Sequence, residues 1–214
     1  MSVIVNEIFY SLQGESTHAG RPCVFVRLTG CNLRCDYCDT QYAYEEGLAM
    51  EIPAILLRVS EYGCGLVEIT GGEPLVQKET PALITSLLDA GHEVLLETNG
   101  SLDIASVDER CVKIMDVKCP SSREEQSNCM GNLKVLSPGD QVKFVVQDRQ
   151  DYEFAKTILP RIPKALPFHQ VLFSPMMDQL APRILAEWML EDRLAARLQV
   201  QLHKIIWPEL DRGV

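Results

Sequence analysis

The stretch Gly30-Cys-Asn-Leu-Arg-Cys-Asp-Tyr-Cys-Asp-Thr40 carries three cysteines, with three residues between the first two and two residues between the last two. No fourth cysteine lies nearby in the sequence. Thiolates gathered in this way are typical ligands of zinc and of iron–sulfur clusters. Structural zinc normally takes four protein ligands, whereas three cysteines on a four-iron cluster leave one iron without a protein ligand. The spacing therefore favours an iron–sulfur cluster with one iron open for chemistry.

Other interpretations of the three cysteines stay open. Cys35 and Cys38 alone form a redox-type pair, but that pair leaves Cys31 without a role. The N-terminal residues lack the basic and apolar regions of a signal peptide, so we expect a cytoplasmic chain with reduced thiols and no disulfide between them. A zinc site completed by His18 or by a distant cysteine is the remaining alternative.

The size and charge of the chain limit its class of function. Its 214 residues are enough for one substantial domain, and we expect a single domain over residues 1–214. The net charge of −10 argues against a nucleic-acid partner, because nucleic acids are bound through basic surfaces. No apolar run is long enough to cross a bilayer, so we expect no membrane partner.

Short β-branched runs alternate with helical periodicity along much of the chain. Strands are predicted over residues 3–10, 23–29, 66–70, 93–98, 112–117, 141–146 and 170–174. Helices are predicted over residues 52–62, 80–90, 151–159 and 182–194, a long loop over 120–140, and a last strand over 200–206. This alternation predicts an α/β fold with a largely parallel sheet.

Chemically versatile residues follow several of these predicted strands. Parallel sheets bind their ligands at the carboxyl ends of the strands, so we expect these segments to meet at one face. They are the cysteine segment, Thr70-Gly-Gly-Glu-Pro74, Asn99-Gly100, the pair Asp116 and Lys118, and Ser174-Pro-Met176.

The cysteine triplet followed by Thr70-Gly-Gly-Glu-Pro74 resembles the radical S-adenosylmethionine (SAM) superfamily. Four further segments are similar to the 7-carboxy-7-deazaguanine synthase family within it: Glu7-Ile-Phe-Tyr-Ser-Leu-Gln-Gly-Glu15, the run from Phe25 to Tyr42, Glu97-Thr-Asn-Gly100 and Gln201-Leu-His-Lys204. The Ser-Leu-Gln-Gly-Glu and Cys-Asp-Thr segments are much more specific than the cysteine triplet, which many reaction types share.

The resemblance implies a fold and a set of cofactors. Seven strands and four helices are fewer than the six full strand–helix units common in the superfamily, so we expect a single-domain, partial (βα) barrel. Cys31, Cys35 and Cys38 would hold a [4Fe–4S] cluster whose fourth iron is chelated by the amino and carboxylate groups of SAM. Thr40 matches the family's Mg²⁺-binding threonine.

The resemblance also implies the contacts of the substrate and of SAM. The implied substrate contacts are Leu12, Gln13, Gly14, Arg27 and Thr70. The implied SAM contacts are Tyr37, Asp39, Gly72, Lys118, Ser121, Pro175 and Met176. The planar fork of Arg27 suits a substrate carboxylate. Two roles are left open: Glu15 is either a structural acid or a substrate contact, and we expect His203 to be half-buried near the pocket or an interface.

The implied activity is that of a lyase. A radical formed from SAM would take hydrogen from C6 of 6-carboxy-5,6,7,8-tetrahydropterin, and the ring would contract to 7-carboxy-7-deazaguanine with loss of ammonia, a step toward 7-deazapurines such as queuosine. The resemblance further implies a homodimer and an electron donor such as flavodoxin or ferredoxin. The alternatives are a radical SAM activase of a glycyl-radical enzyme and a non-enzymatic zinc or iron–sulfur module.

Overall fold

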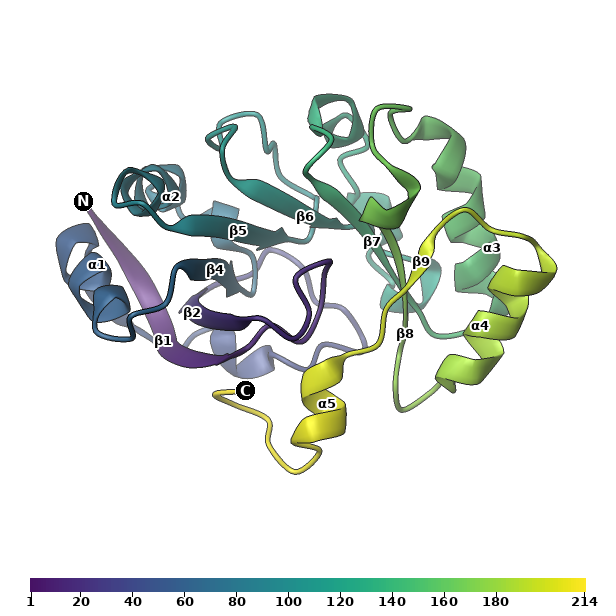
Figure 1. The fold of residues 1–214 in the computed structure, drawn as a ribbon, viewed down its shortest axis with the longest axis horizontal. Helices are drawn as coiled ribbons and strands as arrows, with labels where there is room; N and C mark the ends of the chain where they lie inside the picture. Colours follow the sequence, from purple (N-terminus) through teal and green to yellow (C-terminus); the bar gives the residue numbers. More distant parts are fainter.

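One continuous sheet of nine strands runs through the computed structural model, which describes all residues 1–214 (Figure 1). Its order is β3-β1-β2-β4-β5-β6-β7-β8-β9, parallel from β2 to β9 and antiparallel where β1 pairs with β2 and β3. The strands are β1 Ser2–Leu12, β2 Pro22–Leu28, β3 Leu48–Glu51, β4 Leu66–Gly71, β5 Glu93–Thr98, β6 Val112–Asp116, β7 Gln141–Val146, β8 Val171–Pro175 and β9 Arg197–Leu198.

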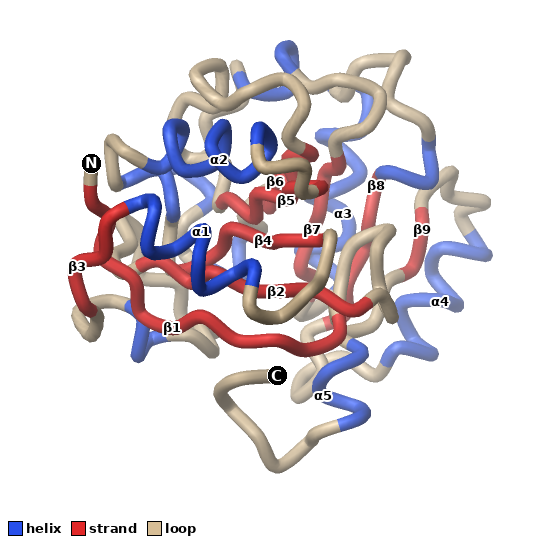
Figure 2. Tube along the Cα trace, turned by 60° about the vertical axis from the view of Figure 1, so that its left-hand side comes forward, coloured by secondary structure: helices blue, strands red, loops and turns tan.

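Four helices cover the outer side of the curved sheet, and a fifth lies near the C-terminus (Figures 1 and 2). They are α1 Ile52–Ser60, α2 Thr80–Asp89, α3 Arg149–Ile158, α4 Pro182–Glu191 and α5 Leu202–Ile206. The first turns of α1, α2 and α4 contain proline, whose missing N–H costs nothing there. The Asp148 side chain caps α3 by accepting a hydrogen bond from the Asp151 N–H at 3.0 Å. None of the five α-helices has the length and apolar character needed to cross a bilayer.

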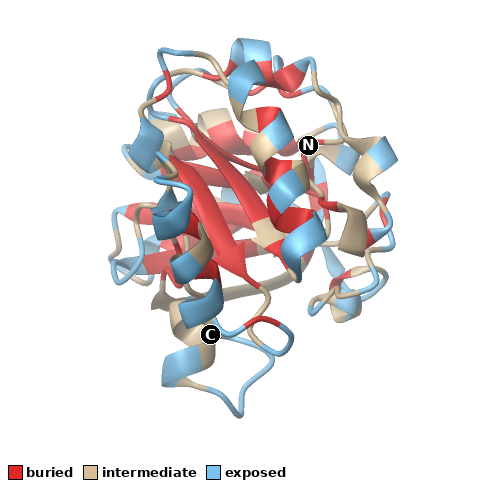
Figure 3. Ribbon diagram, turned by 90° about the vertical axis from the view of Figure 1, so that its right-hand side faces the viewer, coloured by how far each residue is buried: buried red, intermediate tan, exposed pale blue.

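The strands bury apolar side chains on both faces. On β2, Val24, Val26 and Leu28 pack outward against the helices, in one of two large apolar clusters between sheet and helices. The alternate residues Cys23 and Phe25 belong to a smaller cluster on the inner face of the sheet. Figure 3 shows the result in side view, with buried strands behind helices whose outer surfaces are exposed.

The partial barrel is closed by loops rather than by strand pairing. Between β1 and β9 the Leu202 N–H donates to the Gly14 carbonyl at 2.8 Å, and the Ser16 N–H donates to Gln199 Oε1 at 2.7 Å. The loop joining β1 to β2 thus bridges the two ends of the sheet.

The predicted α/β class, largely parallel sheet and partial barrel are confirmed, as are the seven strands and four helices. The predicted strand over 200–206 is wrong, because residues 202–206 form α5. Ile205 and Ile206 are 54% and 42% exposed, so no neighbouring strand covers them. Two short strands, β3 and β9, were not predicted. Residues 120–140 contain only 3-10 turns, as expected of a loop.

Candidate functional site

A cavity of about 590 Å³ opens at the carboxyl ends of the strands. It is lined by the predicted cluster and magnesium residues Cys31, Cys35, Cys38 and Thr40, and by the predicted substrate contacts Leu12, Gln13, Gly14, Arg27 and Thr70. Of the predicted SAM contacts, it is lined by Tyr37, Asp39, Gly72, Lys118 and Met176. Segments far apart in the sequence therefore converge on one site, as expected from their positions after the strands.

Two predicted SAM contacts do not line this cavity. The Ser121 N–H donates instead to Asp151 Oδ1 at 2.9 Å, at the start of α3. Pro175 is buried as the last residue of β8, directly opposite Val146 on β7. In the structure, Ser121 and Pro175 therefore contact α3 and β7, respectively, and not the cavity.

The cysteine segment is held in place by backbone contacts. Gly30 begins it with a φ of +102°, a conformation that favours glycine. The Gly30 N–H donates to the Ala43 carbonyl, and the Glu73 N–H donates to the Gly30 carbonyl, each at 2.8 Å. Leu33 is buried and anchors the middle of the segment. These contacts give the loop a defined shape.

The three thiols have the chemistry that an iron–sulfur cluster requires. All are free and half-buried. Burial raises the pKa of Cys31, and it raises that of Cys35 to about 11 against the opposing charge of Lys118. Binding to iron would deprotonate them outright. No three His, Cys, Asp or Glu side chains converge on a single-ion position.

Two orphaned polar atoms beside the cysteines fit a polar cofactor. The Tyr37 hydroxyl and Asp116 Oδ1 are buried, line the cavity and have no hydrogen-bond partner in the protein. Buried polar groups are nearly always paired, so these atoms indicate that a ligand completes their bonding. A molecule with amino, carboxylate and hydroxyl groups, such as SAM, meets this requirement.

The glycine loop packs directly on the cysteine segment. A Cβ added at Gly72 would lie 2.6 Å from the Cβ of Cys31 and 2.5 Å from the Gly30 carbonyl oxygen. Next to it, the buried Glu73 carboxylate accepts hydrogen bonds from the Asn99 N–H at 2.6 Å and from Thr98 Oγ1 at 2.9 Å. Glu73 therefore holds the loop against the end of β5, which is a structural role.

Arg27 is fixed at one end of its guanidinium and open at the other. Its Nε donates to Glu7 Oε1 at 2.8 Å, and the Tyr42 hydroxyl donates to the same oxygen at 3.1 Å. The rings of Phe9 and Tyr42 flank the guanidinium, each with its centroid 5.7 Å from Cζ. The two terminal nitrogens have no protein partner, so they are available to an anion in the cavity.

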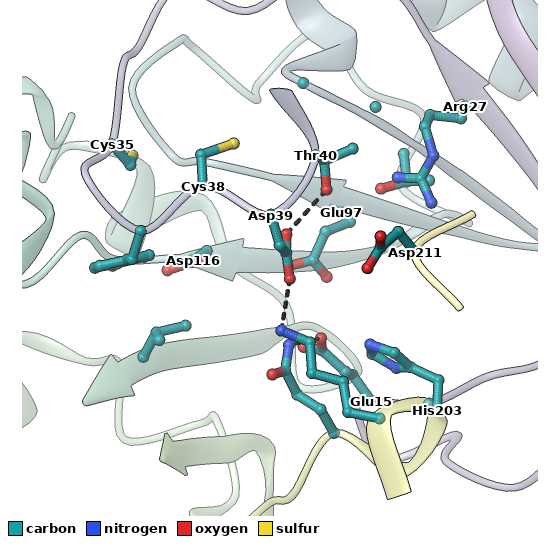
Figure 4. A pocket seen from close by; sticks show the side chains of 18 of the residues that line it. Glu15, Arg27, Cys35, Cys38, Asp39, Thr40, Glu97, Asp116, His203 and Asp211 are labelled. Carbon is teal, nitrogen blue, oxygen red and sulfur yellow. Dashed lines mark hydrogen bonds and ion pairs between the residues drawn. The ribbon is translucent and has the colours of Figure 1, made fainter. Parts of the chain in front are cut away.

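Thr40 belongs to a short polar chain across the cavity (Figure 4). Its hydroxyl donates to Asp39 Oδ1 at 3.0 Å, and Lys204 Nζ lies 2.8 Å from Asp39 Oδ2. Burial acts to raise the pKa of Asp39, but Lys204 and the hydrogen bonds hold it below its ordinary value. A hydroxyl beside an ionised carboxylate is a pair of hard oxygen ligands, which suits Mg²⁺.

Three further residues line the cavity, Glu68, Glu97 and Lys143. None of them has a role assigned from the sequence, and only Glu97 belongs to a segment that resembles the family. Lys143 Nζ lies 2.8 Å from Glu15 Oε2 and also pairs with Glu97. Glu15 additionally accepts a hydrogen bond from the Gln201 amide at 2.8 Å, which gives it a structural partner on each side. The signal that could have revealed Glu68, Glu97 and Lys143 is a charged residue within a predicted strand whose neighbouring residues are mostly apolar.

The C-terminal segment forms another wall that had no sequence signal beyond Gln201 and Lys204. Trp207, Leu210, Asp211 and Val214 all line the cavity. His203, expected near the pocket, lines it too, and a Cβ at Gly14 would lie 2.1 Å from its Nδ1. Gly14 therefore leaves the space that this histidine occupies, and burial lowers the pKa of His203.

Comparisons with known proteins agree with the site. Residues 25–120 match the model of the radical SAM superfamily. The 7-carboxy-7-deazaguanine synthase of Chlorobaculum tepidum is 47% identical over 98% of this chain and 96% of its own length. That of Koribacter versatilis is 44% identical over 98% and 99%. The crystal structure of QueE from Escherichia coli, at 24% identity, shares the fold with a TM-score of 0.75 over 95% of both chains. The chain therefore belongs to the 7-carboxy-7-deazaguanine synthase family of the radical SAM superfamily.

Proposed function

We propose that the chain converts 6-carboxy-5,6,7,8-tetrahydropterin to 7-carboxy-7-deazaguanine with release of ammonia. One observation carries this proposal: a single cavity combines three free cysteines, a glycine loop packed on them, and an arginine with two open nitrogens. Membership of the synthase family supports the same substrate. Nothing in the structure or the comparisons favours the glycyl-radical activase or the non-catalytic metal module.

The cysteine side of the cavity would bind the cofactors. Cys31, Cys35 and Cys38 would hold the [4Fe–4S] cluster, and Gly72 and Tyr37 would lie beside SAM. When bound, cluster and SAM supply the radical chemistry. The residues around them orient the reactants and exclude bulk water, a task to which the C-terminal wall contributes. Ser121 and Pro175, which do not line the cavity, stay predicted contacts for the loaded enzyme.

The opposite side would bind the substrate. Arg27 would hold the substrate carboxylate through its two open nitrogens, and Thr40 with Asp39 would hold the Mg²⁺ that neutralises it. Leu12, Gln13, Gly14 and Thr70 would contact the ring. Burial raises the pKa of Glu97, so its Oε2, which Lys143 does not contact, can hold a proton for the departing amine.

The proposal also covers the domain organisation, the oligomeric state, the cellular compartment and the electron donor. The enzyme would work as a single-domain chain over residues 1–214, in a cytoplasmic homodimer, and it would receive electrons from a flavodoxin or ferredoxin. Support comes from the continuous sheet that spans the chain and from eight cysteines that are all free thiols, as a reducing compartment maintains them.

An anaerobic assay tests the activity. The reconstituted protein is mixed with the carboxylated tetrahydropterin, SAM, Mg²⁺ and dithionite, and products are identified by mass. We expect 7-carboxy-7-deazaguanine and ammonia in equal amounts, and neither without SAM. Cleavage of SAM with no change in the pterin would contradict the proposed substrate, and stoichiometric zinc in place of iron would contradict the proposed chemistry.

A further inference from the structure

The bottom of the cavity holds three glutamates and only one lysine. Lys143 contacts Glu15 and Glu97. The third acid, Glu68, forms no ion pair with any cation in the chain, although it lines the same cavity. A buried acid without a cation is costly unless a hydrogen-bonding partner is supplied.

Glu68 sits in apolar surroundings on the inner face of the sheet. It is 5% exposed, and the strand register places it opposite Phe25 on β2 and Leu95 on β5. Both neighbours belong to the inner apolar cluster. An aliphatic side chain would fill this position of β4 without any desolvation cost, so a structural explanation of the glutamate is weak.

The two oxygens of Glu68 have different surroundings. Oε2 accepts a hydrogen bond from the side-chain amide of Gln13, itself a predicted ring contact. Oε1 has no hydrogen-bond partner in the protein, and it is not among the fully buried unpaired atoms, so it faces the cavity. The free oxygen is therefore available to a ligand.

The position of Glu68 relative to Arg27 gives the ligand an orientation. Arg27 is opposite Thr70 in the register, two residues beyond the pair of Phe25 and Glu68. Two residues along a strand cover roughly 7 Å. A ligand whose carboxylate reaches Arg27 near the mouth thus directs its other end toward Glu68.

We propose that Glu68 determines ring specificity by accepting hydrogen bonds from the amino group and ring N–H of the substrate's 2-amino-4-oxopyrimidine edge. This inference rests on the proposed function, which supplies a pterin as the ligand. The open Oε1 has two lone pairs and can accept from two adjacent N–H donors, whereas a carbonyl at the same ring position would be repelled. Glu68 would thereby favour 2-amino rings over their 2-oxo counterparts.

The proposal also predicts that ligand binding changes the protonation of Glu68. Burial, followed by the charges of Glu97 and Glu15, raises the pKa of Glu68, while Lys143 and Arg27 act against this rise. The Cys23 and Cys111 thiols also interact with Glu68, and burial keeps both neutral by raising their pKa values. A donor edge that binds Glu68 favours its ionised form, so binding near neutral pH releases a proton.

Binding of two non-reactive analogues tests the inference. Pterin-6-carboxylate and its 2-oxo counterpart, lumazine-6-carboxylate, are titrated by calorimetry into the reconstituted enzyme with SAM and Mg²⁺, in buffers of different ionisation enthalpy. The original protein should prefer the pterin and release a proton. Glu68→Gln should bind the pterin roughly 10- to 100-fold more weakly, lose much of the preference and release no proton.

Two further variants make the test decisive. Glu93→Gln removes a glutamate from the opposite end of β5, where it pairs with Arg21, and should change neither property. Glu68→Asp keeps the carboxylate but moves it back by one methylene, so this variant should also lose the preference for the pterin over the lumazine. If Glu68→Gln fails to fold, Glu68→Asp provides the test. An unchanged pterin preference and proton release in either folded Glu68 variant overturns the inference. Failure of the original protein to bind either analogue contradicts the proposed function instead.

Discussion

Gly72 approaches Cys31 so closely that a Cβ added to the glycine would lie 2.6 Å from the Cβ of the cysteine. The second obstacle is the Gly30 carbonyl oxygen, at 2.5 Å, which belongs to the backbone and cannot rotate away. The glycine loop is therefore shaped to fit the cysteine segment as well as any cofactor.

Gly72→Ala should consequently displace the cysteine segment. We expect a folded protein with greatly reduced iron content after anaerobic reconstitution, measured by iron analysis and visible absorption. Gly65→Ala is the matched control, because a Cβ at Gly65 would meet nothing within 4 Å. Equal iron content in the two variants would show that the contact between the loops does not matter for the cluster.

Arg27→Ala should weaken binding of the carboxylated pterin by tens- to thousands-fold, or about 2–5 kcal/mol, because a partly buried guanidinium–carboxylate pair is lost. Arg27→Lys should rescue only in part, since an ammonium cannot reproduce the fork. SAM binding should be almost unchanged. Arg58→Ala removes an exposed arginine paired with Glu61 and serves as the control. Normal pterin binding by Arg27→Ala would move the carboxylate subsite elsewhere.

Thr40→Ala should raise the Mg²⁺ concentration needed for product formation while leaving the iron content intact. The variant loses one hard oxygen but keeps Asp39 and its pairing with Lys204. Thr40→Ser keeps the hydroxyl and should behave like the original protein. Magnesium titrations of the turnover rate measure the effect, and superimposable curves for alanine and threonine would exclude Thr40 as a ligand.

Glu15 should make stability depend on pH in the acid range. Burial acts to raise its pKa, but Lys143 and Gln201 hold it at about 2, below the ordinary 4.5. Ionised Glu15 therefore stabilises the fold above pH 4.5, and this contribution, about 3 kcal/mol at most, is lost as the pH falls toward 2. The test is urea unfolding of the iron-free chain and of Glu15→Gln. The original chain should lose stability more steeply on acidification, and parallel curves would refute the assignment.

Most of the fold could be predicted because apolar residues recur along the chain with the periods of strands and helices. β5 and β7 have the predicted bounds because every second residue is apolar and buried: Val94 and Leu96 on β5, and Val142, Phe144 and Val146 on β7. β3 escaped prediction because three of its four residues are exposed, which leaves no burial pattern in the sequence. The segment 200–206 alternates like a strand, yet the chain must turn at Leu202 to reach Gly14, and it forms α5 instead.

The candidate site was predictable where local motifs mark it. The cysteine segment and Thr70–Pro74 are each contiguous, so their chemistry can be recognised without the fold. Glu68 and Lys143 come from separate strands and acquire a shared environment only when the sheet curves around the cavity. Val214 is brought to the same cavity by the C-terminal segment, and no local pattern indicates that path.

The assignment of Cys31, Cys35 and Cys38 to a catalytic cluster is tested by measuring iron, sulfide and 7-carboxy-7-deazaguanine in the same anaerobic samples of the original protein, Cys35→Ala and Cys64→Ala. Cys64 is half-buried outside the main cavity, so its variant should lose only about 1 kcal/mol of stability. We predict about four irons per chain and product formation for the original protein and for Cys64→Ala. Cys35→Ala should lose the cluster and all product, and a Cys35→Ala protein that still makes the deazaguanine would contradict a catalytic cluster on these cysteines.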